Sequence, residues 1–474
     1  MPATIATQPN VTSLAGGDTK FKDSPWAYVR DEMLFYPKAL YFGLNLVVYV
    51  MHALSANYFL DVWKLPIYKF GYISSLQGFN FFGSLVWSHV ADKINRPRLI
   101  IGLCATVYCV MMCALQANPF DKEKQVIATS VYMALVNGTA QFFLAGCFPL
   151  LDALILALLS RDPRNSKEIF GRQRLWGTFG HCAATYIGIT GKFLMGYAGL
   201  FVMLVACTSF FVSMVVLGIP SNLNVNIHAG GHHGHGGGSH QNERKDAAQI
   251  ERERPTVGSP TIRLLSNPHF LFFMAFILIA GYVRAIMTNF QAYFISKVML
   301  QKDTFVGHAG AIRVVTEVGV FFFGKQLMAF MGPYWMLIFS QVAGILRILG
   351  YGLIPVGVPG WELSVIPLEL LKGLNTGLIV SSAVRLANDI APRDCANTAQ
   401  GLFSGIYTGL ATAVGGMLGG WLIYANLDKP VPMQSMFLIS ALMTSVMTLL
   451  FALKYALVDR VIFTFGRKPN SPLH

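Results

Sequence analysis

The sequence predicts an all-α membrane protein with twelve transmembrane helices arranged in two six-helix bundles. Of its 474 residues, 54% are hydrophobic and only 12% are charged, whereas soluble domains carry about 25% charged residues. Apolar runs such as 40–60 and 433–453 reach the roughly 17–25 residues that cross the hydrocarbon of a bilayer. Because lipid offers the backbone no hydrogen-bond partners, we expect these runs to be helices.

The first bundle is expected in residues 38–218, after a cytosolic N-terminal tail at 1–37. The tail is polar and lacks the apolar core of a cleaved signal peptide, so the first membrane helix is expected to direct insertion. Span boundaries are placed at Pro, Gly and charged clusters. The expected spans are Lys38–Leu60, Phe70–Val90, Arg98–Leu115, Val126–Leu159, Phe170–Gly188 and Leu200–Leu217.

Residues 219–267 are expected to form a flexible cytosolic linker. They combine Gly-His repeats with a run of charges, and such a composition cannot build a packed core. Histidine-rich tracts also bind metals, so a metal-binding linker is the alternative. A second bundle is expected in residues 268–458, followed by a cytosolic tail at 459–474. Its spans are His269–Val298, Thr304–Met331, Tyr334–Leu353, Trp361–Asn388, Ala396–Tyr424 and Met433–Leu457.

The distribution of positive charge predicts the orientation. A net charge of +13 is compatible with nucleic-acid binding, but the Lys and Arg residues lie in short loops between apolar segments. Placing the N-terminus in the cytosol puts most of them on the cytosolic side, as the positive-inside rule requires. We therefore expect both termini in the cytosol, a bilayer environment and no nucleic-acid partner. The plasma membrane is favoured over an internal membrane.

Motifs for metal binding or catalysis are missing from the sequence. The seven cysteines form no Cys-x-x-Cys pair, and six of them lie in apolar segments, so neither a disulfide framework nor a zinc site is expected. No His-Glu-x-x-His or Gly-x-Ser-x-Gly sequence is present. We therefore expect no resident metal, no cofactor and no enzymatic activity.

Two six-helix halves joined by a long cytosolic linker resemble the major facilitator superfamily over residues 38–457. The loop after the second expected span, SHVADKINRPR at 88–98, is similar to the superfamily signature Gly-x-x-x-Asp-Arg-x-Gly-Arg-Lys-Arg. An acidic residue at a helix end can bind the N-terminus of a neighbouring helix, whose dipole favours an anion. The resemblance therefore implies a cytosolic gate made of Asp92, Lys93, Arg96 and Arg98. An ordinary positively charged loop is the alternative.

A second pattern, FGRQRLWGTFG at 170–180, resembles the lactose-permease-like branch of the superfamily. In that branch an arginine and a carboxylate on the preceding helix form a pair that binds sugar. The resemblance assigns those roles to Arg174 and Asp152. Thr178 corresponds to a neighbouring cysteine of that transporter, and His181 replaces the tryptophan on which the sugar ring stacks. The resemblance thus implies a solute site but does not favour galactoside specificity.

Ionisable residues inside the expected spans are the main functional signal. Each costs about 2.5–3.5 kcal/mol to insert at the bilayer centre, so such groups normally face a cavity and a partner. By the branch resemblance, Glu317 serves solute recognition and proton coupling, while Glu369, Lys372 and Asn375 lie on one face of the tenth span. The candidates for proton coupling are Glu317, Asp152 and Glu369. The ionisable candidates are Asp152, Arg174, Arg284, Arg313, Glu317, Arg347, Glu369 and Lys372.

Structural alternatives exist for several of these residues. Glu369 and Lys372, three positions apart, could pair with each other or with Glu317, or could only hold two helices together. Arg313 and Arg347 could lie near helix ends and extend to the membrane surface. For Arg284, the sequence identifies no partner.

These residues lead us to expect a monomeric secondary transporter for a small polar organic solute, either sugar-like or nucleoside-like. Its two halves are expected to expose one central site alternately to each side of the membrane. Proton symport is expected because Glu317 and Asp152 become neutral when they bind a proton. One alternative is an uncoupled facilitative carrier. The other is a membrane receptor or sensor without transport, which is favoured by the departures from the family motifs at Ser88, His181 and Asn375.

Overall fold

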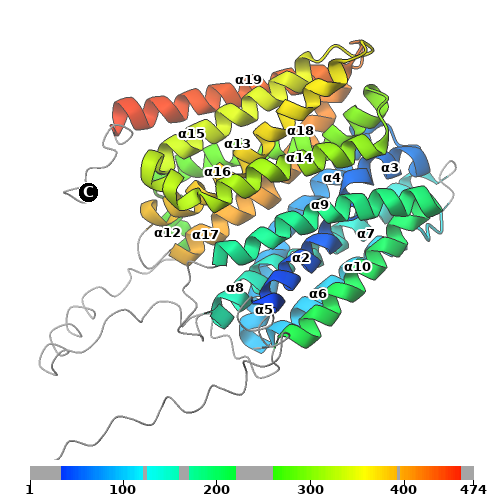
Figure 1. Ribbon diagram of the computed structural model, residues 1–474, viewed down its shortest axis with the longest axis horizontal. Helices are drawn as coiled ribbons and strands as arrows, with labels where there is room; N and C mark the ends of the chain where they lie inside the picture. The colour runs from blue at the N-terminus through cyan, green and yellow to red at the C-terminus, as the bar shows by residue number, and fades with distance from the viewer. Residues whose placement is uncertain are drawn as a thin grey trace, which may run out of the picture.

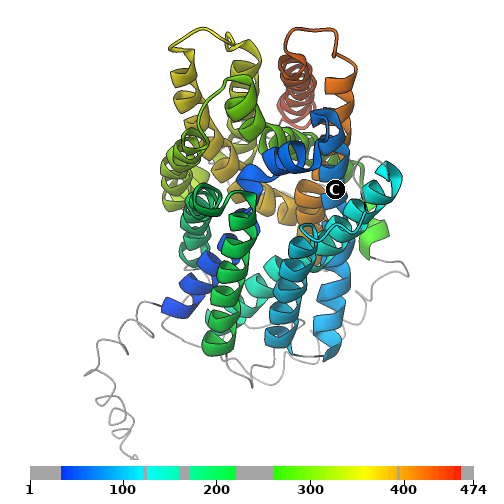
Figure 2. The same ribbon diagram turned by 90° about the vertical axis from the view of Figure 1, so that its right-hand side faces the viewer.

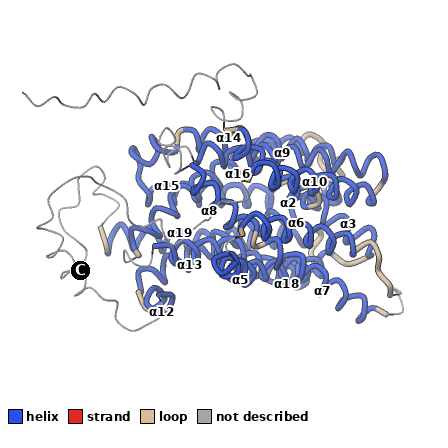
Figure 3. Tube along the Cα trace, turned by 90° about the horizontal axis from the view of Figure 1, so that it is seen from below, coloured by secondary structure: helices blue, strands red, loops and turns tan. Residues whose placement is uncertain are grey.

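The computed structural model describes residues 34–94, 96–120, 125–159, 170–219, 260–391 and 396–460. Within these ranges the chain is helical apart from short connections, and it contains no strand (Figure 3). The expected N-terminal tail up to residue 33, most of the expected linker and the C-terminal tail from residue 461 lie outside the described ranges.

The helices form two groups that follow the order of the chain. Helices α2 to α10 gather on one side of the molecule and α13 to α19 on the other (Figure 1). We call them the N-terminal and C-terminal bundles. The first comprises α2 (Phe35–Tyr49), α3 (Ser55–Trp63), α4 (Ile67–Ser75), α5 (Phe79–Ile94), α6 (Pro97–Ala114), α7 (Val126–Leu144), α8 (Cys147–Leu159), α9 (Phe170–Met195) and α10 (Tyr197–Gly218).

The C-terminal bundle contains several helices that continue through a single wide turn. The π-helical turns are η6 (Phe294–Val298), η9 (Gly405–Leu410) and η10 (Lys454–Val458). The α-helices are α12 (Pro260–Leu265), α13 (Pro268–Tyr293), α14 (Asp303–Phe322), α15 (Gly324–Leu353), α16 (Val365–Ile390), α17 (Ala396–Ser404), α18 (Ala411–Tyr424) and α19 (Pro432–Leu453).

Nine helical segments of the described residues are long and apolar enough to cross a membrane. They correspond to nine of the twelve expected spans. The other three expected spans are α2 with α3, α4 with α5, and α9. The first two are interrupted by 3-10 turns, at His52–Leu54 and Leu76–Gly78, and α9 carries charged and polar side chains along its length. The count of twelve therefore remains a prediction, while the all-helical, multi-pass membrane architecture is confirmed.

The expected eighth span, Thr304–Met331, is wrong at its end. Helix α14 ends at Phe322, and a new helix begins at Gly324. Within α15 the backbone is broken again at Gly332, where φ is 73°, just before Pro333. Proline has no N–H to donate to the preceding turn, and glycine tolerates positive φ. The apolar run continues across all of these breaks, so its length alone could not locate them.

The two bundles contact each other along two lines of helices. One line joins α9 to α14, and the other joins α4 and α5 to η9 and α18. At the second line, a Cβ added to Gly71 would lie 2.6 Å from the carbonyl oxygen of Gly416, and one added to Gly420 would lie 2.5 Å from that of Tyr68. Only glycine permits this backbone approach. Figure 2 shows the blue segment of α3 and α4 beside the orange helices of the other bundle.

Candidate functional site

Polar side chains of α9 and α14 meet across the bundle interface at four places, over 178–192 of α9 and 303–317 of α14. The two helices run antiparallel, so residue numbers decrease along α9 as they increase along α14. Successive contacts are three to six residues apart, or about one to two helical turns. The contacts are Lys192–Asp303, Tyr186–His308, His181–Arg313 and Thr178–Glu317.

The two inner contacts bring together four residues that the sequence singles out. The hydroxyl of Thr178 donates to Oε1 of Glu317 over 3.4 Å, and His181 contacts the guanidinium of Arg313. The ring of His181 also stacks on Tyr49, with centroids 3.6 Å apart and planes within 5°. One face of the imidazole is therefore covered by Tyr49, so His181 does not present that face as a platform for a sugar ring.

Asp152 and Arg174 lie close together in the N-terminal bundle. Nη1 of Arg174 is 3.6 Å from Oδ2 of Asp152, and the hydroxyl of Tyr41 donates to Oδ1 over 2.5 Å. Half of the Arg174 side chain, 49%, is exposed. Arg174 lies one turn from Thr178 on α9, and its exposed surface leaves room for a further partner.

Glu369 has a different partner from the ones that the sequence suggests. Its Oε1 is 2.8 Å from Nη2 of Arg347 on α15 and accepts hydrogen bonds from Gln291 and Tyr351 over 2.8 and 3.0 Å. Both members of the ion pair are almost fully buried. Arg347 therefore does not extend to the membrane surface. Sequence reasoning missed Gln291 and Tyr351, although Arg347 and Tyr351 share a helix face by their spacing.

Lys372 lies one turn after Glu369 but does not bind it. Among the described residues its Nζ has neither a hydrogen-bond partner nor an ion-pair partner, and it interacts electrostatically with Arg313, Arg347, Glu317 and Glu369. The next residue explains why α16 comes so close to α14. A Cβ at Gly373 would lie 2.3 Å from the carbonyl oxygen of Arg313 and 2.7 Å from the amide nitrogen of Glu317.

Asn375 bonds to the neighbouring helix α15. Its Nδ2 donates to the backbone oxygen of Ser340 over 2.7 Å and lies 3.2 Å from its Oγ. The Oγ of Ser340 in turn donates to the carbonyl oxygen of Asn375. The amide thus joins α16 to α15, and its grouping with the solute-binding residues stays a prediction.

Arg284 and Arg313 are both held inside the protein. Arg313 is 8% exposed, which rules out an extension to the membrane surface. Nη2 of Arg284 donates to the carbonyl oxygen of Tyr407 over 3.2 Å and to the hydroxyl of Thr412 over 2.8 Å, and its guanidinium lies 5.0 Å from the centroid of the Tyr407 ring. These partners are neutral, and sequence reasoning could not identify them because they lie more than 120 residues away along the chain.

Of the expected gate residues, Arg98 contacts its own bundle. Nη1 of Arg98 donates to the carbonyl oxygen of Ile219 over 3.2 Å, which joins the start of α6 to the end of α10. Lys93 and Arg96 are exposed. The side chain of Asp92 lies outside what the structure describes. A contact between these residues and the C-terminal bundle therefore remains a prediction.

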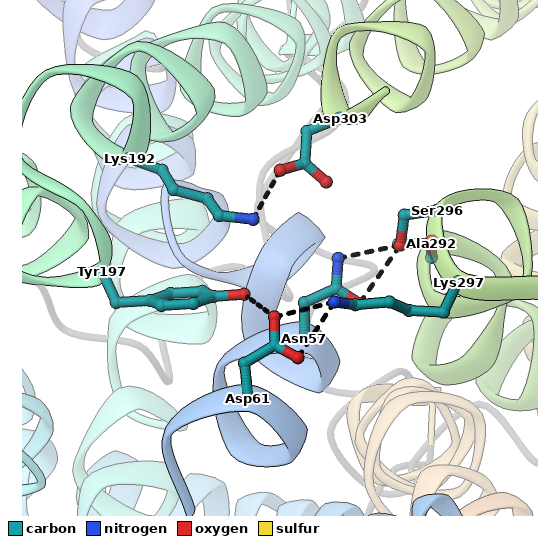
Figure 4. Close-up of polar contacts among 8 residues, drawn as sticks. All are labelled: Asn57, Asp61, Lys192, Tyr197, Ala292, Ser296, Lys297 and Asp303. Atoms are coloured by element: carbon teal, nitrogen blue, oxygen red, sulfur yellow. Dashed lines mark hydrogen bonds and ion pairs between the residues drawn. The ribbon is translucent and has the colours of Figure 1, made fainter. Parts of the chain in front are cut away.

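A cluster of polar side chains joins the two bundles at one end of the molecule. This end lies far from residues 219 and 260, where the described parts of the linker stop. We call it the outer cluster and define it by the residues of Figure 4. Nζ of Lys297 lies 2.9 Å from both carboxylate oxygens of Asp61, and Tyr197 donates to Asp61 over 2.6 Å. The outer cluster also contains Lys192–Asp303 at 2.5 Å and Asn57–Ser296 at 2.9 Å.

Comparison with solved structures shows the same fold in several transporters. The nucleoside transporter NupG aligns with a TM-score of 0.68 at 18% identity, covering 89% of this chain and 98% of NupG. A POT family transporter in complex with a thioalcohol-conjugated peptide aligns at 0.63 and 13% identity, covering 91% and 97%. A bacterial homolog of the human lysosomal transporter Spinster, inward-facing and unoccupied, aligns at 0.62 and 15% identity, covering 93% and 99%. At these identities the likeness shows the fold alone.

The sequence comparison is more specific. No curated protein matches the chain. The sequence profile of the MFS_1 like family, however, matches residues 56–456, which is most of the chain. This range includes both lines of contact between the bundles and every charged residue of the site described above. A transporter family is not a family of enzymes, in agreement with the expectation from the motifs. The protein is a multi-pass membrane protein of the major facilitator type and belongs to the MFS_1 like family.

Proposed function

We propose that the protein is a secondary transporter that moves a small polar organic solute through a site between the two bundles and couples this movement to protons. The observation that carries the proposal is the meeting of Thr178, His181, Arg313 and Glu317 at the α9–α14 interface. Charged groups from both bundles are expensive to hold inside a membrane unless they serve a pathway or a partner. A central site bounded by both bundles is what alternating access requires.

The outer cluster supports alternating access. Asp61 and Lys192 belong to the N-terminal bundle. Lys297, in η6, and Asp303, at the start of α14, belong to the C-terminal bundle. Their ion pairs hold the bundles together at the end opposite the linker. Opening that end requires both pairs to separate. With both termini in the cytosol, as the loop charges favour, this arrangement is an outward-closed state.

Glu317 is the best candidate for the proton site. Glu369 is held by Arg347, Gln291 and Tyr351, and Asp152 is held by Arg174 and Tyr41. Within the ranges that the structure describes, Glu317 accepts one long hydrogen bond, from Thr178. A carboxylate with so few partners can take up a proton without breaking an ion pair, and it lies where the two bundles separate.

The test is uptake into proteoliposomes with an imposed pH gradient. We expect an inward proton gradient to accelerate uptake, and we expect Glu317→Gln to remove this acceleration because the amide cannot be charged. A matched control is Asp428→Asn, which changes an exposed acid in the loop between α18 and α19. Suitable first solutes are sugars and nucleosides, the latter because the neighbour NupG is a nucleoside transporter.

Three outcomes would contradict parts of the proposal. Uptake that is saturable but insensitive to the gradient would indicate an uncoupled facilitative carrier. Solute binding without any accumulation would indicate a receptor or sensor of the same fold. A Glu317→Gln protein that keeps its full response to the gradient would show that the proton binds elsewhere.

A further inference from the structure

The charged groups at and beside the interface of the two bundles include more cations than carboxylates. We call them the central cluster. They are connected through shared neighbours, since Tyr49 interacts electrostatically with Arg284, Arg313, Glu317 and Arg174, and Lys372 with Arg313, Arg347, Glu317 and Glu369. Among the described residues the central cluster holds five cations and three carboxylates, namely Arg174, Arg284, Arg313, Arg347, Lys372, Asp152, Glu317 and Glu369.

Two of the three carboxylates are already neutralised. Glu369 forms its buried ion pair with Arg347, and Asp152 lies beside Arg174. The groups that remain are three cations, Arg284, Arg313 and Lys372, and one carboxylate, Glu317. All three cations act electrostatically on the same side chain, His52, so they lie around one region. This region has two more positive than negative charges, and three more when Glu317 binds a proton.

Hydrogen-bond donors in the same region lack acceptors. Nζ of Lys372 has no partner within the part of the chain that the structure describes. Nε of Arg284 and the hydroxyl of Tyr407 are buried there without a hydrogen-bond partner, and Tyr407 is only 5% exposed. Arg284 otherwise binds neutral oxygens. Buried polar groups are nearly always satisfied in proteins, so these donors point to an acceptor that comes from outside the chain.

We propose that the transported solute is an organic anion, and that its carboxylate or phosphate oxygens bind among Arg284, Arg313 and Lys372. This inference rests on the proposed function and specifies the solute of the same site. An anion supplies the negative charge that the central cluster lacks. Its hydrogen bonds to guanidinium and ammonium groups are charge-assisted and therefore stronger than hydrogen bonds between neutral groups. The guanidinium fork also matches the geometry of carboxylate and phosphate oxygens.

The experiment uses neutral and anionic solutes that differ in one group. The purified full-length protein is heated in detergent with glucose, glucuronate or glucose 6-phosphate, and with uridine or uridine 5′-monophosphate. Sodium chloride at equal ionic strength is the control for inorganic anions. We expect a higher unfolding temperature with anionic members and little change with their neutral counterparts. The glucuronate and phosphate samples show which anionic group is preferred.

Variants of Lys372 test the site itself. Lys372→Met keeps most of the side-chain length but removes the charge, and we expect about tenfold weaker binding of the anion that stabilises the protein, which corresponds to about 1.4 kcal/mol. Lys372→Arg retains the charge and is expected to preserve most of the binding. Lys429→Met, at an exposed loop position, is the matched control and is expected to bind like the unchanged protein.

The outcomes separate this inference from the proposed function. Stabilisation by neutral members alone, by chloride as strongly as by organic anions, or by no anionic member of the panel would overturn the inference. Accumulation of a neutral solute that anions do not inhibit would also overturn it and leave the transport proposal standing. Binding of an anion that is lost in Lys372→Met, without accumulation in proteoliposomes, would support the anion site and contradict transport.

Discussion

The ion pair of Arg347 and Glu369 shows what single residues contribute to this protein. Both side chains are almost completely buried, and Gln291 binds both members, over 2.7 Å to Arg347 and 2.8 Å to Glu369. Such a pair stabilises a fold only while all of its members are present, because either charge left alone in the interior is very unfavourable. Its position between α13, α15 and α16 makes it part of the structure of the C-terminal bundle.

Removing one member of this pair is expected to destabilise the protein by about 3–5 kcal/mol. Arg347→Met leaves the carboxylate of Glu369 without its cation, and the unfolding temperature measured in detergent should fall sharply. The double variant Arg347→Met with Glu369→Leu removes both charges and should recover part of the loss. Arg385→Met, in an exposed pair with Asp389, is the control and should change stability by about 1 kcal/mol or less. Equal effects of both single substitutions would contradict a structural role for the pair.

At this scale the sequence identified the ionisable residues but not their partners. It singled out Glu369, Lys372 and Arg347 because charges are rare within apolar spans. It suggested a pair between Glu369 and Lys372 from their spacing on one helix. The structure pairs Glu369 with Arg347 instead, because α15 packs against α16 there and brings a guanidinium within 2.8 Å. Contacts between helices are not encoded in spacing along one helix.

At the scale of helices, the position of α16 against α14 decides what surrounds Glu317. Gly373 permits this approach because its missing side chain leaves room for the backbone of α14. Lys372 is thereby placed next to Glu317 and Arg313. A Cβ at Gly319 on α14, by contrast, would meet nothing within 4 Å.

Gly373→Ala is therefore expected to reduce solute uptake several-fold and to lower the unfolding temperature. The added Cβ would lie 2.3 Å from the carbonyl oxygen of Arg313, so α16 and α14 must move apart. Gly319→Ala adds the same methyl group in open space and is expected to leave uptake unchanged. Uptake assays on both variants at matched expression provide the measurement. If Gly373→Ala transports as well as Gly319→Ala, the close helix contact is not needed for the site.

On the scale of the whole molecule, the two bundles are joined at one end by polar contacts. The outer cluster holds two ion pairs across the interface, Asp61–Lys297 and Lys192–Asp303. The side chains of both pairs are between 23% and 40% exposed. Exposed ion pairs each contribute only about 0.2–1 kcal/mol to stability. Such modest contacts fit the opening of this end that the proposed alternating access requires.

Reversing one charge of the outer cluster tests this role. Lys297→Asp places a second carboxylate beside Asp61 and is expected to slow uptake about three- to tenfold, because the repulsion disfavours the closed end. The exchanged pair, Asp61→Lys with Lys297→Asp, restores opposite charges and should recover much of the rate. Initial uptake rates of the single and double variants provide the measurement. A double variant as slow as the single one would show that Asp61 and Lys297 do not act through their mutual attraction.

The sequence by itself determined that this protein lies in a membrane, that it is helical and that it has a transporter fold. Apolar length and scarce charge were sufficient for the first two because lipid forces the backbone to satisfy itself within each helix, and the resemblance of the pattern around Arg174 indicated the third. Only the tertiary structure decided which charges meet. It paired Arg347 with Glu369, covered one face of His181 with Tyr49 and bonded Asn375 to Ser340. These outcomes depend on how helices distant in the sequence pack against one another, and that packing sets the charge that faces a solute.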